Sequence, residues 1–78
     1  METENKQVLM MRITLNNRPE TLPNKDSFSI DDLLEHKNFT FKFLVVRING
    51  ETIRREDYDR VMIREGDDVK VIHLISGG

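Results

Sequence analysis

The most distinctive chemical group in this chain is carried by the glycine pair at the end of the sequence. Gly77 and Gly78 follow Ser76, directly after the alternating apolar run of residues 69–75. Glycine has no Cβ, so two in succession form a thin tail that can enter a narrow enzyme slot and adopt the backbone shape required there. We therefore predict that the α-carboxylate of Gly78 is the group that reacts, and that an enzyme recognises Ser76, Gly77 and Gly78 as a tail.

The remaining polar side chains show no pattern typical of an active site. His36 and His73 lack the spacing to each other, or to carboxylates, that metal sites have. Zero cysteines exclude disulfides, thiolate metal sites and a cysteine nucleophile. Asp67-Asp68 is typical of a solvated turn. We expect no catalytic residue, no bound cofactor and no metal site within this chain.

The composition indicates one small folded domain. A chain of 78 residues buries only ~60% of the surface that it exposes when unfolded. Its net charge is −2, and its cations are scattered among acids, as in Arg54-Arg55-Glu56-Asp57, so no basic stripe favours nucleic acid. No apolar run approaches the ~18 residues of a membrane span, and residues 1–4 lack the basic start of a signal peptide. We expect a cytoplasmic protein with neither a nucleic-acid nor a membrane partner.

The elements that must position the tail begin with a hairpin. The run from Leu9 to Leu15 has apolar residues at alternate positions, which predicts a half-buried strand. Asn16-Asn17 favours a tight turn, because Asn tolerates left-handed backbone angles. Residues 18–22 then form a short returning strand, which Pro19 restricts to an edge of the sheet.

A capped helix follows the hairpin. Ser29 can accept a hydrogen bond from a free N–H group of the first turn, and Asp32 can reach back to the cap residue. Phe28 and Leu33 occupy the two positions of a hydrophobic staple. The helix should end near residues 37–38, and so short a helix must be stabilised by packing on a sheet.

Three more strands are predicted after the helix. Residues 41–48 are aromatic and β-branched, Asn49-Gly50 suits a type I′ hairpin turn, and residues 51–53 return briefly. Residues 69–75 form the last strand, after a turn at Gly66-Asp67. The intervening segment 54–64 is charged, with three inward anchors: Tyr58, Val61 and Ile63. This order of elements indicates an α+β domain in which one helix lies across a mixed sheet.

These elements and the terminal Gly-Gly resemble the ubiquitin-like β-grasp fold, and more narrowly the ThiS family of sulfur carriers for thiamine thiazole biosynthesis. The resemblance implies a sheet of four to five strands, a leader at 1–7, a β-grasp domain at 8–75 and a tail at 76–78. Three features depart from the family pattern: Asn17 replaces the usual Gly, the segment Phe39–Phe43 is unusually aromatic, and the leader before Met11 is extra. The similar blocks are residues 11–16, 30–34, 46–51, 55–58, 65–69 and 77–78.

The resemblance implies a specific reaction at Gly78. A ThiF-like adenylyltransferase would activate the carboxylate with ATP and Mg²⁺. A persulfide supplied by a cysteine desulfurase or a sulfurtransferase would then displace AMP and leave a thiocarboxylate. The carrier would deliver this sulfur to thiazole synthase. It would be a protein cosubstrate rather than an enzyme, and would bind no cofactor of its own.

Docking of such a carrier needs more than its tail. Fixing four tail residues costs about 4–8 kcal/mol, at roughly 1–2 kcal/mol each. Burying ~300–400 Å² of apolar surface elsewhere would contribute on the order of 8–10 kcal/mol. If Val46 and Val71 face the helix, strand alternation turns other apolar residues to the open face of the sheet. We predict that this partner-binding patch consists of Phe43, Val45, Ile72 and Leu74.

Several other functions fit the same resemblance. The small subunit of molybdopterin synthase has this fold and the same Gly-Gly chemistry, and carriers for cysteine or homocysteine synthesis are further alternatives. A ubiquitin-type modifier would instead join Gly78 to lysines of other proteins. A plain β-grasp interaction module would have an inert terminus.

Overall fold

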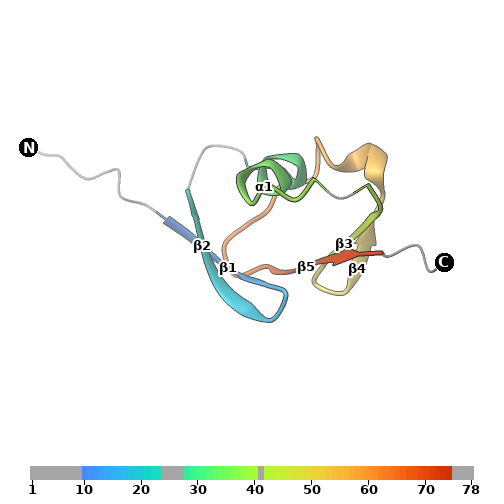
Figure 1. The fold of residues 1–78 in the computed structure, drawn as a ribbon. Coiled ribbons are helices and arrows are strands. Elements are labelled where there is room, and N and C mark those ends of the chain that lie inside the picture. Colours follow the sequence, from blue (N-terminus) through green and yellow to red (C-terminus); the bar gives the residue numbers. More distant parts are fainter. Residues whose placement is uncertain (1–9, 24–27, 41, 75–78) are drawn as a thin grey trace, which may run out of the picture.

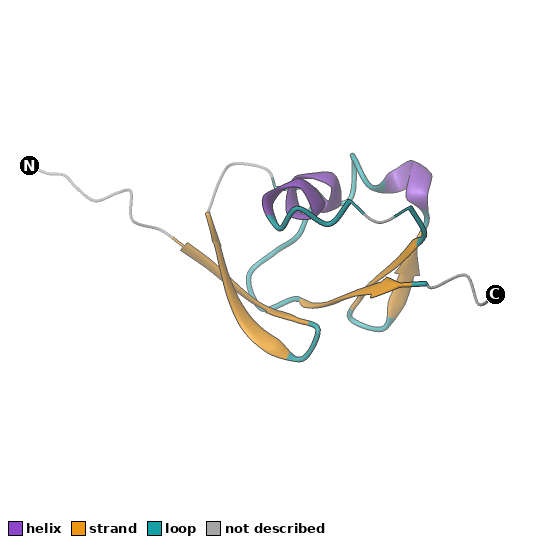
Figure 2. Ribbon diagram, viewed as in Figure 1, coloured by secondary structure: helices purple, strands orange, loops and turns teal. Residues whose placement is uncertain are grey.

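The structure, a computed structural model, describes residues 10–23, 28–40 and 42–74. They form a five-stranded sheet in the order β2-β1-β5-β3-β4 (Figure 1). β1 and β5 are parallel and the other neighbouring strands are antiparallel, so the sheet is mixed, as predicted. The helix α1 and the short 3₁₀ helix η1 lie on the same side of it (Figure 2). The predicted leader at 1–7 and tail at 76–78 lie outside the described residues.

The first hairpin forms as the sequence predicts. β1 (Met10–Leu15) pairs with β2 (Arg18–Pro23), with Leu15 opposite Arg18 across a two-residue turn. Asn16 and Asn17 have φ values of 52° and 69°, the left-handed region that a type I′ turn requires at both positions. β2 is an edge strand, where its two prolines interrupt no inner pair of strands. The prediction of an edge position from Pro19 is confirmed.

The helix α1 (Ile30–His36) has the predicted capping box. The Asp32 backbone N–H donates to Ser29 Oγ at 3.1 Å, and the Ser29 backbone N–H donates to Asp32 Oδ2 at 2.9 Å. Both staple residues, Phe28 and Leu33, are buried. The helix ends at the predicted place, with Lys37 as the C-cap. Within the described residues, no helix is long and apolar enough to cross a membrane.

The second hairpin corrects one predicted boundary. β3 (Leu44–Ile48) and β4 (Glu51–Ile53) are joined by Asn49 and Gly50, whose φ values of 53° and 86° fit the predicted type I′ turn. However, the strand begins at Leu44 rather than at residue 41. Residues 42 and 43 form a bend, because the neighbouring strand ends at His73, the partner of Leu44, and its ladder goes no further. Phe41 lies outside the described residues.

The last strand, β5 (Asp68–His73), lies in the middle of the sheet. The strand is shorter than the predicted 69–75, since pairing with β3 ends at Leu44 opposite His73. One further bond between described residues follows, from the Leu74 N–H to the Phe43 carbonyl at 3.0 Å. Ile75 lies outside the described residues.

The hydrophobic core lies between the sheet and α1. All three anchors predicted in segment 54–64 face it: Tyr58, which follows η1 (Arg55–Asp57), and Ile63 are buried, and Val61 packs against them. The side chains buried most completely are Leu22, Ile30, Leu33, Val46 and Val69.

Candidate functional site

The three tail residues predicted to carry the chemistry are Ser76, Gly77 and Gly78, and they lie outside the described residues. The structure does describe the strand that leads to them. β5 is hydrogen-bonded on both sides, to β1 and to β3, as far as its pairing extends. Pairing with β1 covers Asp68 and Val69, whereas pairing with β3 continues to His73. The part of β5 that leads to the tail is therefore held mainly by β3.

The four residues of the predicted patch come together on the open face of the sheet. Val45 lies directly opposite Ile72 in the antiparallel ladder of β3 and β5. The next pair toward the end of β5 is Phe43 and Leu74, joined by the 3.0 Å backbone bond. Because side chains of opposed residues point to the same face, all four share one side of the sheet.

The exposure of these residues is unusual for their size. Phe43 is 51% exposed, Leu74 48% and Ile72 37%, whereas Val45 is half-buried. The alternate residues Val46 and Val71 are buried against the helix side. The sheet thus has one apolar face inside the core and a second, smaller apolar area facing solvent. Contiguous exposed apolar residues of this kind mark interaction sites.

A pocket of about 320 Å³ lies at the end of this apolar area nearest to the tail. Phe43 and Leu74 contribute to its wall together with Lys42, Leu44 and Arg55. An Arg55 guanidinium N–H donates to the Lys42 backbone carbonyl at 3.1 Å, which ties η1 to the bend before β3. The Lys42 ammonium lies 5.7 Å from the centre of the Phe43 ring. The pocket therefore has an apolar wall and a cationic rim.

From the sequence, Arg54-Arg55 is typical of a charged loop, with contact to an acidic partner surface as the alternative, but neither Arg55 nor Lys42 is placed beside the apolar residues. Arg55 belongs to a charged segment without strand or helix periodicity, so its position depends on how η1 folds back toward residue 42. Lys42 was expected inside a strand. The sequence offers one indication that Lys42 lies beside the apolar area, namely that it directly precedes Phe43 in the chain.

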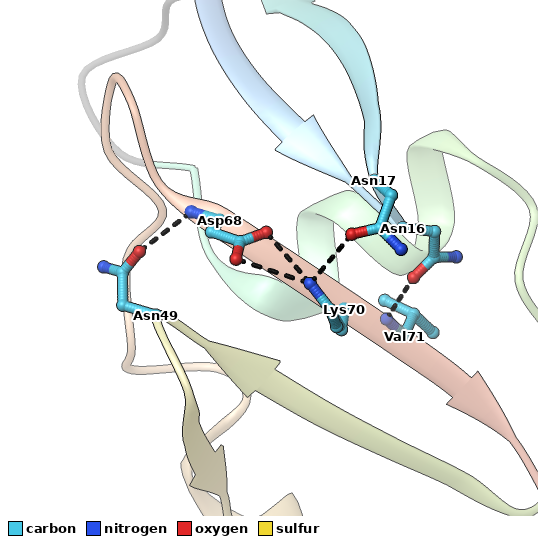
Figure 3. Close-up of polar contacts among 6 residues, drawn as sticks. All are labelled: Asn16, Asn17, Asn49, Asp68, Lys70 and Val71. Carbon is cyan, nitrogen blue, oxygen red and sulfur yellow. Dashed lines mark hydrogen bonds and ion pairs between the residues drawn. The ribbon is translucent and has the colours of Figure 1, made fainter.

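Two turn asparagines fasten the other half of β5 (Figure 3). Val71 N–H donates to Asn16 Oδ1 at 2.8 Å, from the first hairpin turn. Asp68 N–H donates to Asn49 Oδ1 at 2.9 Å, from the second. Between them, Lys70 Nζ donates to Asn17 Oδ1 at 3.2 Å and to Asp68. Both hairpins are thereby fixed to the strand that leads to the tail.

The ionisable groups show little sign of acid–base chemistry. Burial raises the pKa of Tyr58, and the charge of Asp31 adds to this, whereas the charge of Arg55 and a hydrogen bond from the Val46 backbone oppose it. The result is a neutral core hydroxyl at physiological pH. No group of three or more His, Asp or Glu side chains within residues 10–23, 28–40 and 42–74 is arranged to hold a metal ion. His36 and His73 are both exposed.

Comparison with known proteins identifies a consistent set of relatives. The model of the ThiS family matches residues 13–78. The sulfur carrier protein ThiS of Bacillus subtilis (strain 168) is 33% identical over 54 residues, which cover 69% of this chain and 82% of the relative.

Two solved structures from Geobacter metallireducens share the fold. The crystal structure of its thiamine biosynthesis protein (ThiS) aligns with a TM-score of 0.76 and 29% identity, covering 87% of this chain and all of the other. The solution structure of a thiamine biosynthesis protein from that organism aligns with a TM-score of 0.71 and 29% identity, covering 87% of this chain and 88% of the other. The predicted ubiquitin-like β-grasp fold is confirmed by this agreement.

Proposed function

Since this chain belongs to the ThiS family, we propose that it carries sulfur for the thiazole of thiamine as a thiocarboxylate on Gly78. One observation carries the proposal: the family match extends from the folded domain through the terminal Gly-Gly, to residue 78. The relative in Bacillus subtilis is named a sulfur carrier, and the Geobacter structure is named for thiamine biosynthesis.

The proposed chemistry must first make the carboxylate reactive. A carboxylate is a poor electrophile because its charge is delocalised and oxide would have to leave. A ThiF-like adenylyltransferase therefore transfers AMP from ATP, with Mg²⁺, to the carboxylate of Gly78 and releases pyrophosphate. The acyl-adenylate that results has a good leaving group. This chain supplies the substrate carboxylate, and the partner supplies every catalytic group.

Sulfur then enters from a protein persulfide that a cysteine desulfurase or a sulfurtransferase generates. The terminal sulfur attacks the acyl carbon and AMP leaves, which gives an acyl disulfide. A second thiol cleaves the S–S bond, forms a new disulfide and leaves the thiocarboxylate on Gly78. The sulfur of a thiocarboxylate is soft, ionised at neutral pH and a better nucleophile than the carboxylate oxygen. It is transferred to thiazole synthase.

The exposed area formed by Phe43, Val45, Ile72 and Leu74 supports this role. It lies on β3 and β5, next to the point where β5 leaves the sheet toward the tail. A partner that covers these side chains gains apolar burial, which offsets the entropy lost when the tail is fixed. We propose that the adenylyltransferase docks on this area while Gly78 enters its active site.

Intact-mass measurement tests the proposal. The purified chain is incubated with a ThiF-like adenylyltransferase, Mg²⁺-ATP, cysteine and a cysteine desulfurase. The expected mass gain equals the exchange of one oxygen for one sulfur, and it disappears after reaction with thiazole synthase and its substrates. The matched control is the same chain without Gly78, which should gain nothing.

The same experiment separates the alternatives. Sulfur release to a pterin precursor, but not to thiazole synthase, would assign the carrier to molybdopterin synthesis. High-mass adducts on lysines would indicate a protein modifier. An unchanged mass, under conditions in which the partner loads its own carrier, would contradict the proposal.

A further inference from the structure

Three cations border the exposed apolar area without a carboxylate to pair with. Arg47 lies two residues beyond Val45 on the same face, and Lys42 and Arg55 lie at the pocket at the opposite end. All three are exposed, and none forms an ion pair within the described part of the chain. Five other cations do have such partners: Arg12, Lys37, Arg54, Arg60 and Lys70.

Two further described cations, Arg18 and Arg64, also form no ion pair with described residues, and they lie away from the apolar area. Three of the five unpaired cations in the described residues therefore border the exposed apolar side chains. Complementary potentials across an interface raise association rates and exclude wrong partners.

Arg55 is the best oriented of the three cations. Its bond to the Lys42 carbonyl uses one guanidinium N–H and holds the group at the rim of the pocket. A guanidinium has five N–H donors in a planar fork, and a carboxylate can accept two of them at once. No other hydrogen bond from the Arg55 side chain is made to the residues that the structure describes. The group is therefore preorganised to bind an anion.

We propose that the pocket formed by Lys42, Phe43, Leu44, Arg55 and Leu74 receives an apolar side chain of the adenylating partner, beside a partner carboxylate that pairs with Arg55. The inference rests on the proposed function, since it describes the chemistry of that partner's docking surface. The apolar wall requires an aliphatic or aromatic side chain, and the cationic rim requires Asp or Glu next to it. A protein surface satisfies both, whereas a phosphate alone satisfies only the rim.

Adenylation kinetics at two salt concentrations test the inference. The KM for the carrier is measured by partner-catalysed ATP–pyrophosphate exchange at about 50 mM and about 400 mM NaCl, since salt screens exposed charges. For Arg55→Glu we expect a KM on the order of tenfold above the parent at low salt, falling to about threefold at high salt, with kcat unchanged. Arg55→Lys keeps the charge but not the planar fork, so it should recover only part of the loss.

Arg64→Glu is the matched control, because it changes the net charge equally. Arg64 is exposed and precedes β5, at the end of the strand opposite to Leu74. The KM of Arg64→Glu should stay within about twofold of that of the parent, as expected for a charge remote from the contact. Lys42→Glu provides a second variant at the rim, and it leaves in place the backbone carbonyl that Arg55 uses.

The outcomes distinguish this inference from the proposed function. If the partner does not adenylate the parent chain, both the proposed function and this inference are wrong. If the partner adenylates the parent, the KM values of Arg55→Glu and Lys42→Glu decide the inference. It is overturned, and the proposed function is not, if both variants have the same KM as Arg64→Glu at both salt concentrations. A loss confined to kcat also overturns it, because docking would then be intact.

Discussion

The side chain of Asn16 accepts the backbone N–H of Val71 at 2.8 Å, across 55 positions of sequence. β1 ends at Leu15, so the Asn16 side-chain oxygen takes the place that the next strand carbonyl would have held. The Asn16 backbone N–H adds a second bond, to the Val69 carbonyl at 2.9 Å. One turn residue thus extends the pairing of β5 beyond the end of its parallel partner.

Removing the Asn16 side chain should weaken the fold. Asn16→Gly keeps the left-handed backbone but leaves the half-buried Val71 N–H without its acceptor, so we expect a loss of about 1 kcal/mol in the free energy of unfolding. Asn16→Ala loses the same bond, and it also lacks the short polar side chain through which Asn tolerates a φ of 52°, which should cost about 1 kcal/mol more. Urea denaturation measures both.

Asn17→Gly is the control for the turn itself. Asn17 also has a positive φ, but its side-chain oxygen accepts only an exposed bond from Lys70 at 3.2 Å. The free energy of unfolding of Asn17→Gly should lie within about 0.5 kcal/mol of that of the parent. Equal stability of Asn16→Gly and the parent would show that the Val71 bond contributes nothing.

The raised pKa of Tyr58 predicts a loss of stability at high pH. The folded chain holds the phenolic proton to higher pH than the unfolded chain, which releases it near the ordinary tyrosine pKa of 10.0. The stabilisation is complete below that value and is lost as the pH rises through the folded pKa. Tyr58→Phe has no such proton, so the advantage of the parent over this variant should be constant up to about pH 9 and shrink above about pH 10, as the pH passes through the folded pKa.

The measurement is the free energy of unfolding of both chains across that pH range. Lysines also titrate there, but they are common to both chains and cancel in the difference. A difference that stays constant with pH, or grows, would contradict the assignment of burial as the main cause of the shift.

Ile72→Asp should impair docking of the adenylyltransferase without unfolding the domain. Ile72 is 37% exposed at the centre of the apolar area, so a carboxylate there can remain hydrated in the free chain. In the complex it would have to lose water without a partner, and we expect the KM for adenylation to rise at least about tenfold. The midpoint of urea unfolding should stay close to that of the parent.

Thr21→Asp is the matched control on the same sheet. Thr21 is exposed and lies on the edge strand β2, opposite Arg12 and two strands away from Ile72. It should leave adenylation unchanged. Unaltered kinetics for Ile72→Asp would exclude the apolar area as the docking site.

Local chemistry explains which parts of the fold were predictable from sequence. Ser29 with Asp32 specifies a helix start, and Asn16-Asn17 and Asn49-Gly50 specify turns, because each signal acts within a few residues. The alternation of Val69 and Val71 identified the inner face of the last strand, and with it the exposure of Ile72.

Contacts between distant segments were not predictable in the same way. Residues 41–43 carry strand-forming side chains, but the extent of β3 depends on where β5 stops. Likewise, nothing near Arg55 indicates that its guanidinium meets the carbonyl of Lys42, 13 positions earlier. The patch could be inferred from alternation alone, whereas its cationic rim required the fold.

The place of β5 in the sheet also affects how the protein is made. It is the last of the described strands to be synthesised, yet in the described sheet it is the strand that joins the hairpin of β1 and β2 to that of β3 and β4. While the nascent chain is still on the ribosome, two separate hairpins leave the tunnel with no strand to join them, and the core lacks the side chains of Val69 and Val71. We expect cotranslational folding to be postponed until residues 68–73 emerge. A chain that ends before these residues should therefore stay unfolded and be degraded by proteases.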